Sequence, residues 1–136
     1  MKKLLHLNLL IISVIAFNSC SVKETPNGLG GDDIQLSVKA VEFSSAGDSV
    51  TIKTGGSWWN IGGISVDSTN YYDFPGVNRQ AVSYTLKKDC FDVQRRDNHT
   101  LFIKVQSNPN SAKRIITVGL GAGDYFDRVT ITQKAK

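Results

Sequence analysis

The sequence is poor in the residues that build disulfide frameworks, zinc sites and catalytic triads. Its 136 residues include two cysteines and two histidines. Two cysteines cannot form a disulfide framework. One histidine lies near the N-terminus, so His99 alone remains in the body of the chain, too few for a zinc site or a histidine-based triad. No window carries an apolar stripe at helical spacing, which argues against a helical domain.

A positively charged leader without acidic residues opens the chain. Lys2 and Lys3 precede an apolar run over residues 4–17, which is shorter than the roughly 20 residues needed to cross a bilayer core. These features indicate a secretory signal. With Cys20 at the cut, it resembles a bacterial lipoprotein signal of the relaxed form common in Bacteroidetes. We expect residues 1–19 to be a signal peptide and Cys20 to be lipidated. An ordinary secretory signal or a retained anchor are the alternatives.

Beyond the leader the chain has the length of one domain, about 116 residues. The leader holds two of the 16 basic side chains and no acid, so 14 basic and 12 acidic side chains remain, a formal balance of +2. Without a clustered basic stripe, no nucleic-acid partner is expected. Residues 20–33, with the lipidated cysteine at their start, are rich in glycine and predict a flexible tether. We expect the lipid to hold the domain, residues 34–136, in the cell envelope at the outer membrane. The sequence does not determine whether the domain lies on the periplasmic or the surface side of that membrane.

Alternating apolar and polar residues predict strands throughout residues 34–136. Turn signals separate these runs at spacings near ten residues. The apolar parity changes between Ile34 and Phe43, which predicts a bulge or a crossover between sheets near Lys39. The pattern favours an all-β fold, an immunoglobulin-like antiparallel β-sandwich of about seven to eight strands. The expected strands are 34–43, 49–54, 58–66, 79–87, 90–95, 100–106, 113–119 and 125–133.

The domain contains three distinctive short patterns: a Gly-Gly-Ser turn leading to Trp59, an Asn-Pro-Asn turn before the strand that begins near Arg114, and a closing Thr-Gln at Gln133. On these patterns the domain resembles BACON domains, Bacteroidetes-associated modules of surface carbohydrate-processing systems. The resemblance implies an immunoglobulin-like sandwich without enzyme activity. Strand parity directs Trp59 and Ile61 into the core and Trp58 outward, while Gln133 would close the last strand against a neighbour.

No catalytic residue, metal site or cofactor is predicted. A carboxylate pair of the glycosidase kind could be drawn from four aspartates, but most of them lie in turn-like segments. The acidic residues near the two ends of the domain lack EF-hand spacing. We therefore expect a protein that is not an enzyme. The four aspartates are Asp67, Asp73, Asp92 and Asp97.

An aromatic and polar segment around residues 67–80 is the best candidate for binding, because loops carry function more often than sandwich faces do. Flat aromatic rings can stack on the C–H faces of sugars, while amides and charges bind hydroxyl groups. The alternatives are that these rings cap the end of the sandwich, or that they contact a protein. The candidate residues are Trp58, Tyr71, Tyr72, Phe74, Asn78 and Arg79.

These observations predict a lipid-anchored, non-enzymatic envelope module for adhesion or contact with a polysaccharide or mucin-type glycan. The alternative is a structural or assembly subunit that docks on an envelope protein. Cys90 is expected to be a buried thiol, with an intermolecular disulfide or a reactive thiol as alternatives. A basic group is expected to protect a sheet edge from aggregation, or to bind an anionic polysaccharide or lipid headgroups. It comprises Lys87, Lys88, Arg95 and Arg96.

Overall fold

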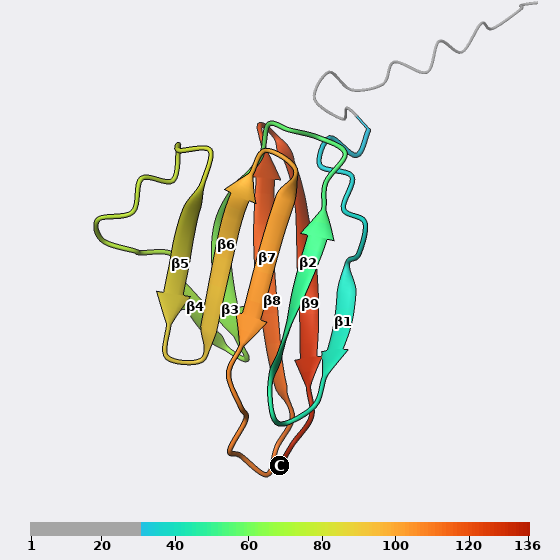
Figure 1. The fold of residues 1–136 in the computed structure, drawn as a ribbon, viewed down its shortest axis with the longest axis vertical. Coiled ribbons are helices and arrows are strands. Elements are labelled where there is room, and N and C mark those ends of the chain that lie inside the picture. The colour runs from blue at the N-terminus through green and yellow to red at the C-terminus, as the bar shows by residue number, and fades with distance from the viewer. Residues whose placement is uncertain (1–30) are drawn as a thin grey trace, which may run out of the picture.

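The computed structural model describes residues 31–136 and has nine strands in two stacked sheets (Figure 1). The predicted signal peptide, Cys20 and nearly all of the tether lie outside the described residues. The five-stranded sheet has the order β1-β9-β8-β3-β4, and the four-stranded sheet has the order β2-β7-β6-β5. In the first sheet, the bounds are β1 Ala40–Phe43, β3 Asn60–Val66, β4 Thr69–Tyr71, β8 Arg114–Ala122 and β9 Tyr125–Gln133. In the second they are β2 Asp48–Lys53, β5 Tyr84–Lys88, β6 Phe91–Asp97 and β7 Thr100–Val105.

The all-β immunoglobulin-like sandwich is confirmed, and so is the crossover of the first segment between sheets. Leu36 forms an isolated antiparallel bridge with Thr54, next to β2, whereas Ala40–Phe43 pairs with β9 in the other sheet. The prediction of one continuous strand over 34–43 was therefore wrong, because a chain that changes sheets must leave one hydrogen-bonding ladder before it joins the next. The pairing of β1 with β9 is parallel, which corrects the expectation of antiparallel pairing throughout.

Two further strand predictions need correction. The short strand β4 was not predicted, which makes nine strands rather than seven or eight; it follows a tight turn at Asp67, whose φ is +51°. The expected strand 79–87 begins only at Tyr84, because residues 79–83 form turns closed by the Ala81 N–H donating to the Asn78 carbonyl. Local side-chain and turn hydrogen bonds compete there with the sheet ladder.

The core lies between the sheets and contains the residues that strand parity assigned to it. Trp59 and Ile61 are buried, and Trp58 is 79% exposed. The Trp59 indole N–H donates to the Asn98 carbonyl at 2.8 Å and to Thr54 Oγ1 at 3.0 Å. Trp59 immediately precedes β3, and the buried indole with its donor satisfied anchors the start of that strand. Among residues 31–136 there is no helix long and apolar enough to span a membrane.

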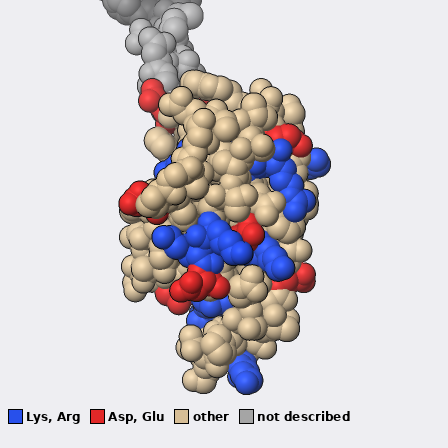
Figure 2. All heavy atoms as spheres, turned by 60° about the vertical axis from the view of Figure 1, so that its left-hand side comes forward, with Lys and Arg blue, Asp and Glu red and all other residues tan. Residues whose placement is uncertain are grey.

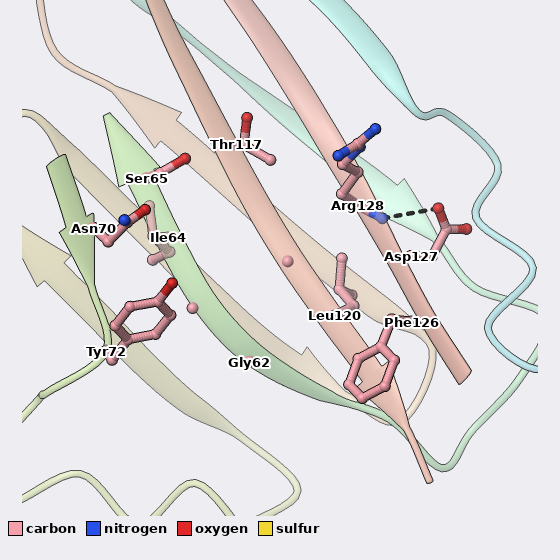
Figure 3. Close-up of a pocket in the computed structure, with 12 residues that line it drawn as sticks. Gly62, Ile64, Ser65, Asn70, Tyr72, Thr117, Leu120, Phe126, Asp127 and Arg128 are labelled. Carbon is pink, nitrogen blue, oxygen red and sulfur yellow. Dashed lines mark hydrogen bonds between the residues drawn. The ribbon is translucent and has the colours of Figure 1, made fainter. Parts of the chain in front are cut away.

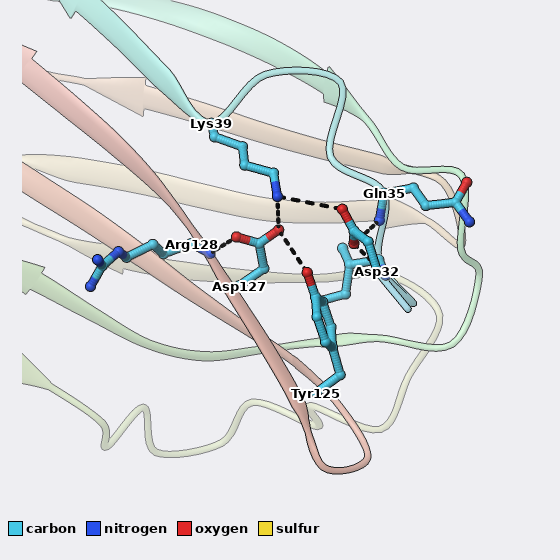
Figure 4. A network of polar contacts seen from close by, with 7 residues as sticks. Asp32, Gln35, Lys39, Tyr125, Asp127 and Arg128 are labelled. Carbon is cyan, nitrogen blue, oxygen red and sulfur yellow. Dashed lines mark hydrogen bonds and ion pairs between the residues drawn. The ribbon is translucent and has the colours of Figure 1, made fainter. Parts of the chain in front are cut away.

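A polar network fastens the segment before β1 to the start of β9 (Figure 4). Lys39 Nζ lies 2.7 Å from a carboxylate oxygen of Asp127 and 3.4 Å from one of Asp32. The Tyr125 hydroxyl donates to Asp127 at 3.5 Å. The Gln35 N–H donates to Asp32 at 2.6 Å, and this bond comes first among the causes that lower the pKa of Asp32. The network sets where the chain enters the sandwich.

Candidate functional site: a glycine-floored groove

The outer face of the five-stranded sheet holds a groove of about 430 Å³ between two exposed aromatic rings. Tyr72 follows β4 and is 65% exposed; Phe126 lies in β9 and is 76% exposed. Figure 3 shows the two rings on opposite sides of the strand positions that form the floor. Exposed rings flanking one concavity are typical of a binding surface.

Glycines make the floor of this groove and seat its two walls. A Cβ at Gly63 would lie 2.7 Å from two carbons of the Tyr72 ring, and a Cβ at Gly121 would lie 3.4 Å from the Phe126 ring. Each ring therefore rests on backbone that carries no side chain. Gly62 and Gly119 complete the floor between them. Glycine inside a strand marks a close approach to the backbone, and here it creates both the depth of the groove and the orientation of the rings.

Neutral polar groups line the groove beside the rings. Ser65 comes from β3, Asn70 from β4 and Thr117 from β8. Hydroxyl and amide groups both donate and accept hydrogen bonds. Arg128 and Asp127 lie at the β9 side (Figure 3). The Asp127 carboxylate is already engaged by Lys39 at 2.7 Å (Figure 4). The groove thus combines apolar rings and uncharged hydrogen-bonding groups with two charged residues, Asp127 and Arg128, at its β9 side.

Arg79 holds the loop after Tyr72 against β3. Its guanidinium donates to the carbonyls of Ile61, Gly62 (2.8 Å) and Tyr72 (3.2 Å). Because the Tyr72 carbonyl is fixed in this way, the ring at the groove wall is held by its own backbone as well as by Gly63. Arg79 therefore acts on the groove through the position of Tyr72.

The structure separates the six residues predicted to bind. Phe74 is buried and Tyr71 is half-buried. Both rings meet the Phe91 ring edge-on, with 5.5 Å between ring centres for Tyr71 and 6.4 Å for Phe74. These two rings pack the end of the sandwich, the alternative that the sequence left open. Asn78 is exposed, and its side chain accepts the Gln80 N–H at 3.1 Å within a turn.

Of the six, Tyr72 alone lines the groove. Trp58 and Arg79 line a second hollow, together with Gly121, the glycine on which the Phe126 ring of the groove rests.

Sequence reasoning missed Phe126 and the glycines, although a signal for both exists. In β9 the residues Val129 and Ile131 point inward. Because side chains alternate along a strand, Phe126 has the opposite parity and points outward. In β8, Gly119 and Gly121 share the outward parity. Two glycines on one face of a strand, with an aromatic residue on the same face of the next, indicate a shallow site.

Arg95 does not join the predicted basic group at the sheet edge. Arg95 turns into the sandwich and is 7% exposed, whereas Arg96 stacks on the Phe102 ring at 3.7 Å. Lys88 lies 5.3 Å from the centre of the Phe74 ring. Seen from the β5 side, basic side chains gather across the middle of the molecule with acidic ones beside them (Figure 2).

Two of the aspartates weighed as a carboxylate pair are engaged in turns. Asp67 accepts the Ile115 N–H at 2.8 Å, and Asp97 accepts the His99 N–H at 2.7 Å and the Thr100 hydroxyl at 3.0 Å. The His99 N–H is the main cause that lowers the pKa of Asp97. In the part of the chain that the structure describes, no three His, Cys, Asp or Glu residues are grouped so as to hold a metal ion.

Comparison with known proteins adds support for the fold. No family model and no curated protein matches the sequence. An NMR structure of a protein from Bacteroides thetaiotaomicron is similar, with a TM-score of 0.63 and 18% identity over 78% of this chain and 90% of that chain. A Bacteroides ovatus GH5 xyloglucanase in complex with a XXXG heptasaccharide gives a TM-score of 0.46 and 19% identity, covering 75% of this chain and 19% of that chain. The first likeness supports the β-sandwich fold, and membership of the BACON family stays a prediction.

Proposed function

We propose that this chain is a non-enzymatic glycan-contact module of the cell envelope and that it binds a saccharide in the groove between Tyr72 and Phe126. The observation that carries the proposal is the pair of rings, each more than half exposed and each seated on a glycine. Large exposed rings around a concavity are costly to leave in water and offer a surface to an apolar partner. The C–H faces of a pyranose provide such a surface.

A saccharide also fits the polar lining of the groove. Ser65, Asn70 and Thr117 offer uncharged donors and acceptors beside the rings. Sugar hydroxyls have the same dual character, so they can replace the water that these groups lose on binding. A purely apolar ligand would leave the three side chains without partners. A saccharide satisfies both parts of the groove at once.

Binding of wild type and single variants to a glycan array, followed by titration calorimetry, tests this function. We expect Tyr72→Ala and Phe126→Ala each to weaken binding by about tenfold or more, which corresponds to about 1.4 kcal/mol. Ile115→Thr is the matched control, because Ile115 is an exposed apolar residue of β8 outside the groove lining. Urea unfolding of each variant shows whether the fold is intact.

The outcome that contradicts glycan binding is equally clear. If wild type bound no saccharide at millimolar concentration, the groove would not be a glycan site. Recovery of one envelope protein by crosslinking at Phe126, with loss of that product in Tyr72→Ala, would then favour the alternative function, a subunit that docks on an envelope partner. Turnover of a polysaccharide by the purified chain would contradict the non-enzymatic part of the proposal.

We also propose that lipid on Cys20 anchors the module to the membrane. The support is the leader sequence: a basic start, an apolar run and a cysteine at the cut. Two or more acyl chains give stable anchoring, at about 0.8 kcal/mol for each buried CH₂. Cys20→Ala is expected to move the protein from the membrane fraction to the soluble fraction. A Cys20→Ala protein that still sediments with membranes would contradict the anchor.

A further inference from the structure

A second hollow, of about 420 Å³, lies beside the β8–β9 turn and is lined by two arginines and by neither aspartate nor glutamate. Trp58 stands at its rim, 79% exposed, with its ring 3.6 Å from where a Cβ of Gly123 would lie. Asn60 and Gln80 add amide groups to the lining. The hollow therefore has a flat ring, neutral hydrogen-bonding groups and two positive charges around one space.

Arg95 brings the first positive charge. It lies in β6 and points between the sheets, where it is 93% buried. Its guanidinium carbon is 4.9 Å from the centre of the Trp59 ring. The two terminal nitrogens donate to the carbonyls of Ala81 (3.2 Å) and Ser57 (3.1 Å) and to the Asn98 side chain (3.3 Å). The Nε–H is buried and has no hydrogen-bond partner.

No ion pair among the described residues joins this charge to a carboxylate. In the part of the chain that the structure describes, both ion pairs belong to Lys39, with Asp32 and Asp127. Backbone carbonyls and an aromatic face offset part of the cost of burying a guanidinium, but a buried charge without a counter-ion remains expensive. The buried Arg95 guanidinium, in the wall of the hollow and without a counter-ion in residues 31–136, therefore favours binding of an anion in that hollow.

Arg79 brings the second positive charge, and it also links the hollow to the groove. It donates to the carbonyls of Ile61, Gly62 and Tyr72 and, like Arg95, makes no ion pair with an acid of the described residues. Gly62 belongs to the groove floor, and Gly121, which seats the Phe126 ring, lines the hollow as well. The two sites therefore adjoin at Phe126.

We propose that the hollow beneath Trp58 is a subsite for the anionic group of an acidic sugar unit, a carboxylate or a sulfate ester, in a chain whose neighbouring unit occupies the groove. This inference rests on the proposed glycan function and adds the substrate class. Guanidinium groups match the paired oxygens of carboxylate and sulfate better than other cations do. Trp58 stacks on the sugar ring while Arg79 and Arg95 supply the field for the charge.

Titration of the full chain with two pairs of tetrasaccharides tests the subsite. One pair is tetragalacturonate and its methyl ester, which have the same rings with and without the negative charge. The other is a sulfated galactan fragment and its desulfated form. We expect at least one charged member to bind about tenfold or more tightly than its neutral partner, and this preference to shrink as salt rises. Which pair responds tells a carboxylate from a sulfate.

Two variants and one spectroscopic signal connect that preference to the hollow. Arg79→Gln is expected to reduce the preference for the charged member several-fold, and Trp58→Ala to weaken both members of the pair. Arg96→Gln is the matched control, because it removes the same charge from the next residue of β6, whose side chain lies on Phe102. In wild type, the Nε–H resonance of Arg95 should shift as the charged tetrasaccharide is added, which needs no Arg95 variant that folds.

Each result decides between the two proposals. Two results would contradict the anionic subsite: equal binding of the charged and neutral members, or a loss of preference in Arg79→Gln no larger than in Arg96→Gln. Neither result would contradict glycan binding in the groove. If the Arg95 resonance stayed fixed at saturation, the charge would be recognised elsewhere and the subsite would again be wrong. Absence of binding by all four tetrasaccharides, together with a silent glycan array, would overturn both.

Discussion

Arg114 and Gln133 face each other across β8 and β9 as a buried hydrogen-bonded pair. Arg114 donates to Gln133 Oε1 from Nε at 3.0 Å and from Nη2 at 2.6 Å. Both residues also donate to the Gln106 carbonyl, at 2.8 Å from Arg114 and 2.9 Å from Gln133. Two sequence patterns far apart in the chain, the Arg strand and the closing Thr-Gln, therefore meet in one cluster that closes this end of the sandwich.

Removing Gln133 should be among the most destabilising single changes in the domain. Gln133→Ala leaves the buried Arg114 Nε–H without its acceptor and removes one of the two hydrogen bonds to the Gln106 carbonyl, at an expected cost of about 3 kcal/mol in the free energy of unfolding. Urea denaturation followed by tryptophan fluorescence measures the change. Thr132→Ala, one residue earlier in β9, is the control and should cost less than about 1 kcal/mol. Equal costs for the two variants would show that the cluster contributes little.

The seat of Tyr72 can be altered without touching the ring. Gly63→Ala places a Cβ where two ring carbons stand at 2.7 Å, so the ring must move away from the groove wall. Because the obstructing atoms belong to a side chain rather than to backbone, we expect a small change in stability and a loss of saccharide affinity of several-fold. Gly31→Ala is the control, since a Cβ there meets nothing within 4 Å. Undiminished affinity in Gly63→Ala would mean that the position of Tyr72 does not matter for binding.

Strand parity predicted the core well because burial on one face of a strand is a local property. Trp59 and Ile61 are inside and Trp58 is outside, as the alternation requires. The crossover near Lys39 was also predictable, since a change of parity in an unbroken apolar run has few structural explanations. The parallel partner of β1 was not predictable, because strand order depends on contacts between segments about ninety residues apart.

The binding site was harder to predict because its walls come from separate strands. Tyr72 was found from its aromatic neighbours, but two of those, Tyr71 and Phe74, pack on Phe91 instead. Adjacent aromatic residues in a loop do not reveal which rings turn inward. Phe126 was missed because it lies more than fifty residues from Tyr72 in the chain, and only the sheet order places the two strands around one glycine floor.

The polar network around Asp32 and Lys39 should make the free energy of unfolding depend on pH. The Gln35 N–H is the first cause that lowers the pKa of Asp32 from its ordinary value of 3.8. A pKa that is lower in the folded state means that the stabilising contribution is present above about pH 3.8 and is lost as pH falls through the folded value. Asp32→Asn should therefore be less stable than wild type at pH 6, and the difference should vanish near pH 2.

Urea unfolding at the two pH values measures this dependence. Asp33→Asn is the control, because it removes the neighbouring charge outside the network. The Lys39 amine acts in the opposite range: its hydrogen bond to Asp127 raises its pKa above 10.5, so that contribution is lost only as pH rises through the higher folded value. A stability difference for Asp32→Asn that stayed constant from pH 6 to pH 2 would contradict the role of the carboxylate.

Cys90 should react slowly with alkylating reagents in the folded chain. It is half-buried between β5 and β6 beside the core, and burial is the main cause that raises its pKa above the ordinary value of 9.0. Because only the thiolate is nucleophilic, a raised pKa leaves less of the reactive form at pH 8. Iodoacetamide labelling of the Cys20→Ala chain, followed by mass spectrometry, reads Cys90 alone. We expect labelling to be at least about tenfold slower than in the same chain unfolded in urea and to accelerate as pH rises. Equal rates in the two states would support the reactive-thiol alternative instead.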